Sequence, residues 1–391
     1  MSTIEKRYNK WRSNFVKTWG DMTYIDYNQK HEQEPSNAAT CSEAVGYGML
    51  ISVLMKNQRD FDGFLRWFLH FRNKNDLCAW QQIKVHGSYK NTGDGGENSA
   101  TDGDIDIATA LFYASHVWGR SGDGRVDYRQ EGIRLAKAIW EKDINHYTYM
   151  PTLGDWVNIK PADGHRHSGS SGSHGHGQQG VFAMGGGASA FKHGDEDKHA
   201  GATRPSDFIL AGFLTFYHED VERSQQWARV MDSIIATVQH NLQLHPNTGL
   251  IADFLRVARN GHYEPHPQKI LESENDKDFN WNSCRVPWRL SVYYLLTHDP
   301  RVLPTLQAES NFFGSQKEIF AGYHLDGKRI SGRNYNDLSY TAPASICMWV
   351  TNNPNLKKVQ QQMSDLESDK SYFGDSIQLL CLLQAQNPRG W

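Results

Sequence analysis

Apolar residues recur every three or four positions along most of the chain, a pattern typical of amphipathic helices. In residues 104–118, for example, Ile105, Ala108 and Leu111 fall on one helical face. We therefore predict about twelve helices. Their expected ranges are 6–19, 43–56, 60–72, 104–118, 128–143, 206–217, 224–242, 284–296, 301–312, 340–350, 355–366 and 372–385. Only residues 249–257 and 318–325 have a strand-like pattern.

Helices in even number, joined by loops and accompanied by little strand signal, indicate an all-α toroid of antiparallel helix hairpins. In such a barrel the loops at one end of the inner helices form an open cleft. Glu43, Asp102 and Asn282 all lie near predicted helix starts. Free N–H groups and the positive end of the helix dipole lie there. We therefore expect one end of the barrel to gather these three positions.

A chain of 391 residues can form one large domain or two ordinary ones. We interpret residues 1–391 as a single domain that carries an insertion at 160–202. The insertion is rich in His, Gly and Ser and cannot bury enough apolar surface to order itself alone. Its histidines could bind a metal, but no fixed ligand spacing supports one, so we expect a surface insertion and no metal site. They are His165, His167, His174, His176, His193 and His199.

Charge and composition exclude several classes of protein. A net charge of −3 argues against a dedicated nucleic-acid binder. No apolar run reaches the length of a membrane span, so we expect no membrane partner. Five widely spaced cysteines without a CxxC pair argue against a disulfide framework or a structural zinc site. The first residues, 1–6, lack a signal-peptide core, which leaves a cytosolic protein or a secreted one whose signal was removed.

Two acidic motifs carry the candidate chemistry. The first is Cys41–Met49, in which Glu43 precedes an apolar run, and the second is Ala100–Ala108. The chain also has 12 Trp, 17 Tyr and 17 Phe, which either build a large aromatic core or provide flat surfaces for sugar rings. Paired carboxylates near aromatic surfaces are what hydrolysis of a polysaccharide requires.

Each of these acids can be explained either by a structural role at a helix start or by a role in catalysis or binding. A desolvated Glu43 would have a raised pKa and act as a proton donor, but Glu also simply favours the start of a helix. The second motif contains Asp102, Asp104 and Asp106, more acids than helix capping needs. The spacing of an EF-hand calcium loop is absent. We favour a clamp for sugar hydroxyls, with Asp102 on the sugar and Asp104 as the cap.

These motifs resemble those of family 8 glycoside hydrolases, from about Tyr8 to Leu383. The most specific element is Ala100–Ala108, continuing to Trp118, which is similar to the family signature. The segment 42–49 is similar to the helix start that bears the family's general acid. The resemblance implies an (α/α)6 barrel and hydrolysis with inversion of configuration.

The resemblance also implies roles for single residues. Glu43 matches the general acid, and Asp102 matches the carboxylate that contacts the sugar at the cleavage subsite. Trp80 matches a stacking residue of the cleft, and Arg285 matches an arginine that follows the base. The full set of expected substrate-binding residues is Asp102, Trp80, Tyr47, Asp207, Asn282, Arg285 and Tyr372.

The chain departs from the family pattern at Asn282, where the cellulases and xylanases have the Asp that serves as general base. An amide cannot accept that proton. In one explanation, the chain resembles the subgroup of Bacillus-type chitosanases and mixed-linkage glucanases, whose base is a Glu in a preceding loop. Glu272 is then the base, with Glu274 second. In the other, Asn282 is an engineered substitution. We prefer the first, because 281–289 has the pattern of a natural segment and Asp207 also matches that subgroup.

We therefore predict an inverting endo-hydrolase of a β-1,4-linked polysaccharide, with no cofactor and no metal. Chitosan is the first expected substrate, because Asp207 and the Glu272–Glu274 loop would add negative charge for a cationic polymer. Lichenan or cellulose is the alternative. A non-catalytic carbohydrate-binding protein is the alternative of another class, because losing the base can leave a binding cleft intact. We expect an extracellular monomer, with a cytoplasmic location left open.

Overall fold

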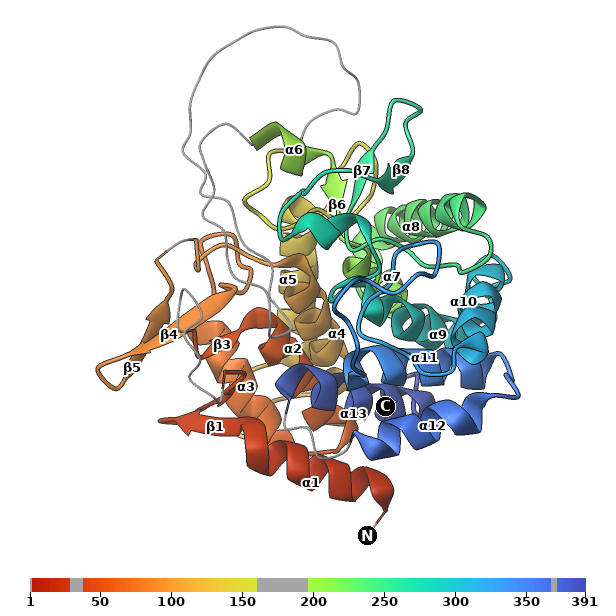
Figure 1. Ribbon diagram of the computed structural model, residues 1–391. Helices are drawn as coiled ribbons and strands as arrows, with labels where there is room; N and C mark the ends of the chain where they lie inside the picture. The colour runs from red at the N-terminus through yellow and green to blue at the C-terminus, as the bar shows by residue number, and fades with distance from the viewer. Residues whose placement is uncertain (1, 29–37, 94, 160–195, 367–370) are drawn as a thin grey trace, which may run out of the picture.

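The computed structural model describes residues 2–28, 38–93, 95–159, 196–366 and 371–391, and helices dominate it (Figure 1). Each of the predicted helices is confirmed, with boundaries that shift by a few residues, but residues 16–19 of the first range form a strand and not the end of a helix. The helices that build the barrel are α1 (Thr3–Phe15), α2 (Ser42–Leu54), α3 (Gln58–His70), α4 (Thr101–Val117), α5 (Tyr128–Lys142), α7 (Leu210–Glu219), α8 (Ser224–Leu244), α9 (Val286–Thr297), α10 (Leu303–Ser315), α11 (Leu338–Val350), α12 (Leu356–Asp365) and α13 (Tyr372–Gln386).

These helices form two concentric rings. In the inner ring, α2, α4, α7, α9, α11 and α13 each contact the next, and α13 returns to contact α2. The helices α1, α3, α5, α8, α10 and α12 alternate with them in the sequence and pack on the outside. This is the (α/α)6 barrel that was expected.

Hydrophobic patterning explains which helix goes where. Helix α2 is buried on every side from Ser42 to Val53, whereas α5 buries only one face of its length. A helix that is apolar all round belongs inside, and a helix with one apolar stripe covers the surface. The sequence alternates between the two kinds, and the barrel follows from that alternation.

Two of the predicted helices begin with short 3-10 turns. Residues 206–217 divide into η1 (Pro205–Asp207) and α7, and residues 284–296 begin as η4 (Ser283–Arg285) before α9. Both turns lie at the same end of the barrel, because η1 contacts η4 and also α4. They place Asp207 and Arg285 beside the start of α4.

In the part of the chain that the structure describes, three small antiparallel sheets accompany the barrel. They are β1 (Val16–Trp19) with β2 (Met22–Ile25), then β3 (Thr40–Cys41), β4 (Gln81–Val85) and β5 (Ser88–Asn91), then β6 (Ala202–Thr203), β7 (Leu255–Val257) and β8 (Tyr263–Pro265). Of the two strand-like ranges, 249–257 contains β7, but 318–325 forms no named strand and pairs only through isolated bridges of Tyr323.

Most of the predicted insertion, residues 160–195, lies outside the described residues, and so do its histidines before 196. Its last part forms α6 (Glu196–Ala200) and the start of β6. His199 is buried there, and its Nε2 lies 3.0 Å from the Ile270 carbonyl oxygen. Within the described ranges, no group of His, Cys, Asp or Glu side chains is arranged to hold a metal ion. No helix in those ranges is long and apolar enough to cross a membrane. The five cysteines are free and buried.

Candidate active site

Two glycines bring the acidic motifs together. A Cβ atom on Gly46 would lie 2.8 Å from Asp106 Cβ, and one on Gly103 would lie 2.5 Å from Ser42 Oγ. Real Cβ atoms do not approach so closely, so α2 and α4 can only pack at this distance because both positions are glycine. The close packing sets the first turns of the two helices side by side, with Glu43 on one and Asp102 on the other.

Arg285 lies at the centre of the acidic side chains. Its Nη1 donates to Glu43 Oε2 at 2.7 Å and to Asp102 Oδ2 at 3.4 Å. The same atom lies 3.4 Å from Tyr47 Oη, one helical turn behind Glu43. The guanidinium is almost fully buried, so these charge-assisted hydrogen bonds act in a medium of low dielectric constant.

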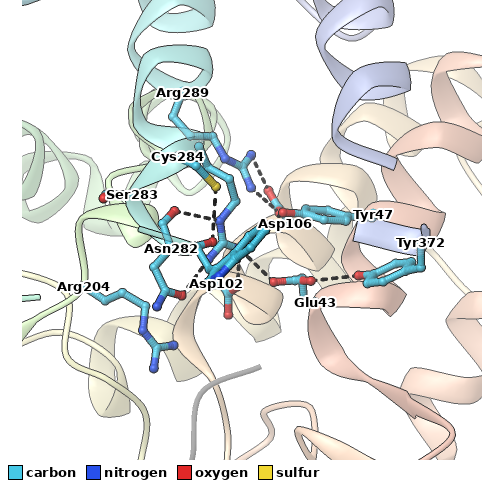
Figure 2. Close-up of polar contacts among 12 residues, drawn as sticks. Glu43, Tyr47, Asp102, Asp106, Arg204, Asn282, Ser283, Cys284, Arg289 and Tyr372 are labelled. Atoms are coloured by element: carbon cyan, nitrogen blue, oxygen red, sulfur yellow. Dashed lines mark hydrogen bonds and ion pairs between the residues drawn. The ribbon is translucent and has the colours of Figure 1, made fainter. Parts of the chain in front are cut away.

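Glu43 has the environment of a proton donor. Its side chain is 1% exposed, and Tyr372 Oη donates to its Oε1 at 2.9 Å (Figure 2). Burial raises the pKa of Glu43 to about 7, although Arg285 opposes the shift, and the charge of Asp102 adds to it. A carboxyl with a pKa near neutrality can hold its proton until the reaction needs it.

Asn282 links this cluster to a second group of acids. Its Oδ1 accepts from Arg285 Nη2 at 2.9 Å. Its Nδ2 donates to Glu272 Oε2 at 2.6 Å and lies 3.3 Å from Asp253 Oδ2. The amide oxygen thus contacts a cation, and the amide nitrogen contacts two carboxyl groups.

Glu272 is the second buried carboxyl of the site. Its side chain is 6% exposed, and Arg204 Nη2 donates to its Oε1 at 3.3 Å. Burial raises the pKa of Glu272 to about 8, while Arg204 and the amide of Asn282 act in the opposite direction. Glu272 and Glu43 are not in contact, because the Arg285 guanidinium and the Asn282 amide lie between them.

The backbone around Glu272 is organised by Asp276. Its Oδ2 accepts from the backbone N–H groups of Ile270, Leu271 and Glu272 at 2.9, 2.7 and 3.0 Å, and its Oδ1 accepts from Ser273 N at 2.9 Å. These four hydrogen bonds fold the loop around the Asp276 carboxylate, and the Glu272 side chain then points to Asn282. Glu274, the second candidate for the base, is exposed.

The remaining expected residues surround these groups. Trp80 is 4% exposed, its Nε1 has no hydrogen-bond partner among the described residues, and its carbonyl oxygen accepts from Ser42 N at 2.8 Å. Tyr47 packs its ring edge against Trp288 at a centroid distance of 6.1 Å. Asp207 is fully buried, and burial raises its pKa well above the usual range, with Asp102 adding to the effect.

Some residues of the site were not predicted. Asp253 accepts from the backbone N–H groups of residues 280, 282 and 283, and holds the turn that carries Asn282. Arg289 forms two hydrogen bonds with Asp106, at 3.0 and 2.6 Å, and locks α9 to α4. Arg204 pairs with Glu272 across a large separation in sequence. No local motif surrounds Asp253, and although Arg204 begins the segment 204–208 that resembles the chitosanase and mixed-linkage glucanase subgroup, nothing in that segment points to its contact with Glu272.

Comparisons with known proteins find similar polysaccharide hydrolases. The family model described as Glycosyl hydrolases family 8 matches residues 2–161. A beta-glucanase of Niallia circulans is 29% identical over 395 residues, which covers 98% of this chain and 83% of the relative. Endoglucanase A of Acetivibrio thermocellus is 25% identical, over 97% of this chain and 68% of the relative. The apo structure of beta-1,3-1,4-glucanase from Paenibacillus sp. X4 superposes with a TM-score of 0.77 and 27% identity, over 99% of this chain and 92% of that one.

The fold and these matches identify the chain as an endo-acting glycoside hydrolase. More narrowly, the chain is similar to proteins of glycoside hydrolase family 8, whose model matches residues 2–161. The non-catalytic alternative is therefore set aside. The expected likeness to chitosanases finds no support, because the similar proteins are named glucanases.

Proposed function

We propose that the chain is an endo-β-glucanase that cleaves β-1,4 linkages, with mixed-linkage β-1,3-1,4-glucan as its first substrate. The observation that carries the proposal is the pair of buried carboxyl groups, Glu43 and Glu272, on opposite sides of the Arg285–Asn282 contact. Inverting glycosidases need two carboxyl groups about 6.5–9.5 Å apart, because a water molecule must fit between the second group and the sugar. The likeness to proteins named glucanases supports the choice of polymer.

In this mechanism Glu43 donates its proton to the glycosidic oxygen as the bond to the leaving sugar breaks. Glu272 removes a proton from a water molecule, which attacks the anomeric carbon from the opposite face. The transition state carries positive charge on the sugar ring, and the carboxylate of Asp102 stabilises it. Arg285 links the two carboxyl groups of the site, because it donates to Glu43 directly and to Asn282, which in turn donates to Glu272.

We also propose that Asn282 is the native residue. Its Nδ2 faces the carboxyl groups of Glu272 and Asp253, while its Oδ1 faces Arg285. An Asp here would place a third carboxyl against two others, and like charges in a buried site are unfavourable. The surroundings of residue 282 therefore fit an amide better than an acid, which leaves Glu272 as the base.

The structure weakens the charge argument for chitosan, the first substrate expected from the sequence. That expectation relied on negative charge from Asp207 and the loop of Glu272. Asp207 is buried with a raised pKa, and Glu272 is paired with Arg204. Of the acids in that argument, only the exposed Glu274 still offers a charge to a cationic polymer. We further propose a single catalytic domain that acts as a monomer outside the cell, because polymeric glucan cannot enter a cell.

The test is release of reducing ends by the unmodified chain on lichenan, carboxymethyl-cellulose, chitosan and xylan in parallel. We expect lichenan to be cleaved fastest, with the new anomeric centre inverted when NMR follows the first minutes. Rapid turnover of chitosan without any turnover of lichenan would contradict the proposal that mixed-linkage glucan is the substrate.

Two variants test the assignment of the carboxyl groups. Glu43→Gln and Glu272→Gln should each lower kcat by at least about 10³-fold, near the upper part of the range for general acid–base catalysis. Glu274→Gln is the matched control, because that side chain lies in the same loop but is exposed. If Glu274→Gln is inactive and Glu272→Gln retains activity, the base has been assigned to the wrong residue.

A further inference from the structure

A groove on the outside of the barrel is lined by α1, α11, α12 and α13, which neighbour one another (Figure 1). Its cavity volume of about 340 Å³ falls in the range of roughly 300–1,000 Å³ that is usual for small-molecule sites. The groove extends along α13 to Gln386, which lies about 21 Å along the helix axis from Tyr372 at the active site. None of the proposed catalytic or substrate-binding residues lines it, so it is separate from the catalytic cleft.

The groove contains an exposed tryptophan. All 12 Trp residues lie in the described part of the chain, and only Trp349 is exposed, at 46%. Its indole forms no aromatic or cation–π pair with another described residue. The apolar side chains of Ile346, Met363 and Leu382 line the same groove, so the indole continues an apolar surface. A flat aromatic ring on such a surface can stack on the apolar face of a sugar ring.

Gln378 supplies an oriented hydrogen-bond donor to the same groove. Its side chain is 5% exposed, and Arg7 Nη1 donates to its Oε1 at 2.7 Å. A guanidinium can only donate, so this contact fixes the amide oxygen toward Arg7 and turns the NH₂ group away from it. That NH₂ group has no hydrogen-bond partner among the described residues, and it is not among the nitrogen atoms that are closed off from solvent. It is therefore free to donate to a ligand.

The remaining polar side chains of the groove are neutral as well. They are Thr3, Ser345, Gln360 and Gln386. No lining residue in the described part of the chain carries a charge, so the groove offers no ion pair to a charged ligand. Hydroxyl and amide groups beside an apolar surface suit a neutral ligand with hydroxyl groups at its edges and apolar faces. A neutral sugar polymer has this chemistry.

A protein partner fits the groove less well. A stable protein interface takes about 20–30 residues from each side, with several large apolar side chains at its centre. The other large apolar side chains that are exposed in the described part of the chain lie elsewhere, and none of them lines the groove. They are Tyr147, Val221, Leu244 and Tyr335. Trp349 is thus a single contact point and not the centre of an extended apolar patch.

We propose that this groove is a second binding site for β-glucan, in which Trp349 stacks on a glucose ring and Gln378 Nε2 donates to a sugar hydroxyl. The choice of glucan rests on the proposed function, because the groove by itself indicates only a neutral ligand with hydroxyl groups. A polymer bound there has a raised effective concentration at the cleft of the same molecule. A short oligosaccharide cannot span both sites and gains nothing.

The kinetic test compares lichenan with cellotetraose as substrates. Trp349→Ala should raise KM for lichenan about 2- to 10-fold, the range for a lost aromatic contact, and leave kcat and the turnover of cellotetraose unchanged. Trp349→Tyr keeps a flat ring and should restore most of the loss, whereas Gln378→Met removes the donor and should raise KM in the same way. Tyr147→Ala is the control, because Tyr147 is exposed at 58% but lies outside the groove. Equal changes on both substrates would show that Trp349 acts through the cleft or the fold.

A binding test needs no turnover. In a Glu43→Gln background, migration through a native gel that contains lichenan should be retarded, and Trp349→Ala should weaken this retardation while Tyr147→Ala does not. Unchanged retardation together with unchanged KM would overturn the second site. If Trp349→Ala weakens retardation but the parent does not cleave lichenan, the groove binds glucan and the proposed activity fails. If the parent sediments as a dimer that Trp349→Ala dissociates, a second copy of the chain occupies the groove and the glucan site is wrong.

Discussion

At the scale of single residues, Asn282 shows how an amide can serve where relatives of the cellulase type are expected to use an acid. Its two ends have opposite polarity, and each meets the partner that suits it: Arg285 at the oxygen, Glu272 and Asp253 at the nitrogen. The short contact of 2.6 Å to Glu272 aims that carboxyl and stabilises its ionised form. The amide therefore supports Glu272, the proposed base, instead of replacing it.

Asn282→Asp should lower kcat/KM by at least about 30-fold, because a third carboxyl beside Glu272 and Asp253 would repel them or take a proton from the site. Michaelis–Menten kinetics on lichenan measures the loss. The matched control is Asn280→Asp, since the Oδ1 of Asn280 accepts from Arg333 at 2.9 Å and a carboxylate there keeps its cation. A gain of activity in Asn282→Asp would mean that residue 282 is itself the base position.

The pH dependence follows from the pKa of Glu43 at about 7 and of Glu272 at about 8. Below the lower value both carboxyl groups are protonated, so the base is lost. Above the higher value both are ionised, so the acid is lost. Because the higher pKa belongs to the proposed base, the active form, with Glu43 protonated and Glu272 ionised, is the minor singly protonated form between the two values. We still expect kcat/KM on lichenan to be bell-shaped, with limbs near these two values belonging to the pair as a whole. A profile that stays level from about pH 5 to 10 would contradict the assignment of both groups.

At the scale of elements, the proposed acid and the proposed base are held in place by different parts of the structure. Glu43 lies on an inner helix whose packing against α4 is fixed by Gly46 and Gly103. Glu272 lies on a loop, and that loop keeps its shape through four backbone hydrogen bonds to Asp276. The proposed base is therefore held by one side chain, whereas the proposed acid is held by the packing of the barrel helices.

Asp276→Asn should disturb the base without disturbing the barrel. The single carbonyl oxygen of Asn can replace only part of the acceptor capacity, and its NH₂ group would face backbone donors. We expect a loss of about 1–3 kcal/mol in the free energy of unfolding and a fall in kcat that exceeds any change in KM. Asp326→Asn is the control, because Asp326 accepts a single backbone N–H, from Lys328, on another loop. Equal kcat in the two variants would show that Asp276 does not position Glu272.

At the scale of the whole molecule, the barrel could be predicted from the sequence and much of the site could not. Helical periodicity identified the twelve barrel helices because each buries a continuous stripe or a whole surface. The strands were mostly missed, because strands of two to five residues are too short to show alternation. Contacts such as Arg204 with Glu272 join distant segments, and only the closed ring brings them together. Burial of Asp207 also overturned an argument from its formal charge.

Closure of the inner ring has a measurable consequence, because Tyr372 on α13 donates to Glu43 on α2. This hydrogen bond favours the ionised form of Glu43 and lowers its pKa, so Tyr372→Phe should raise that pKa. The acid then keeps its proton to higher pH. The ratio of kcat/KM above both limbs to that below them should increase about 2- to 10-fold, the equivalent of one net hydrogen bond. Tyr340→Phe is the control, because the buried hydroxyl of Tyr340 on α11 has no hydrogen-bond partner among the described residues. An unchanged ratio in Tyr372→Phe would show that closing the ring does not tune the acid.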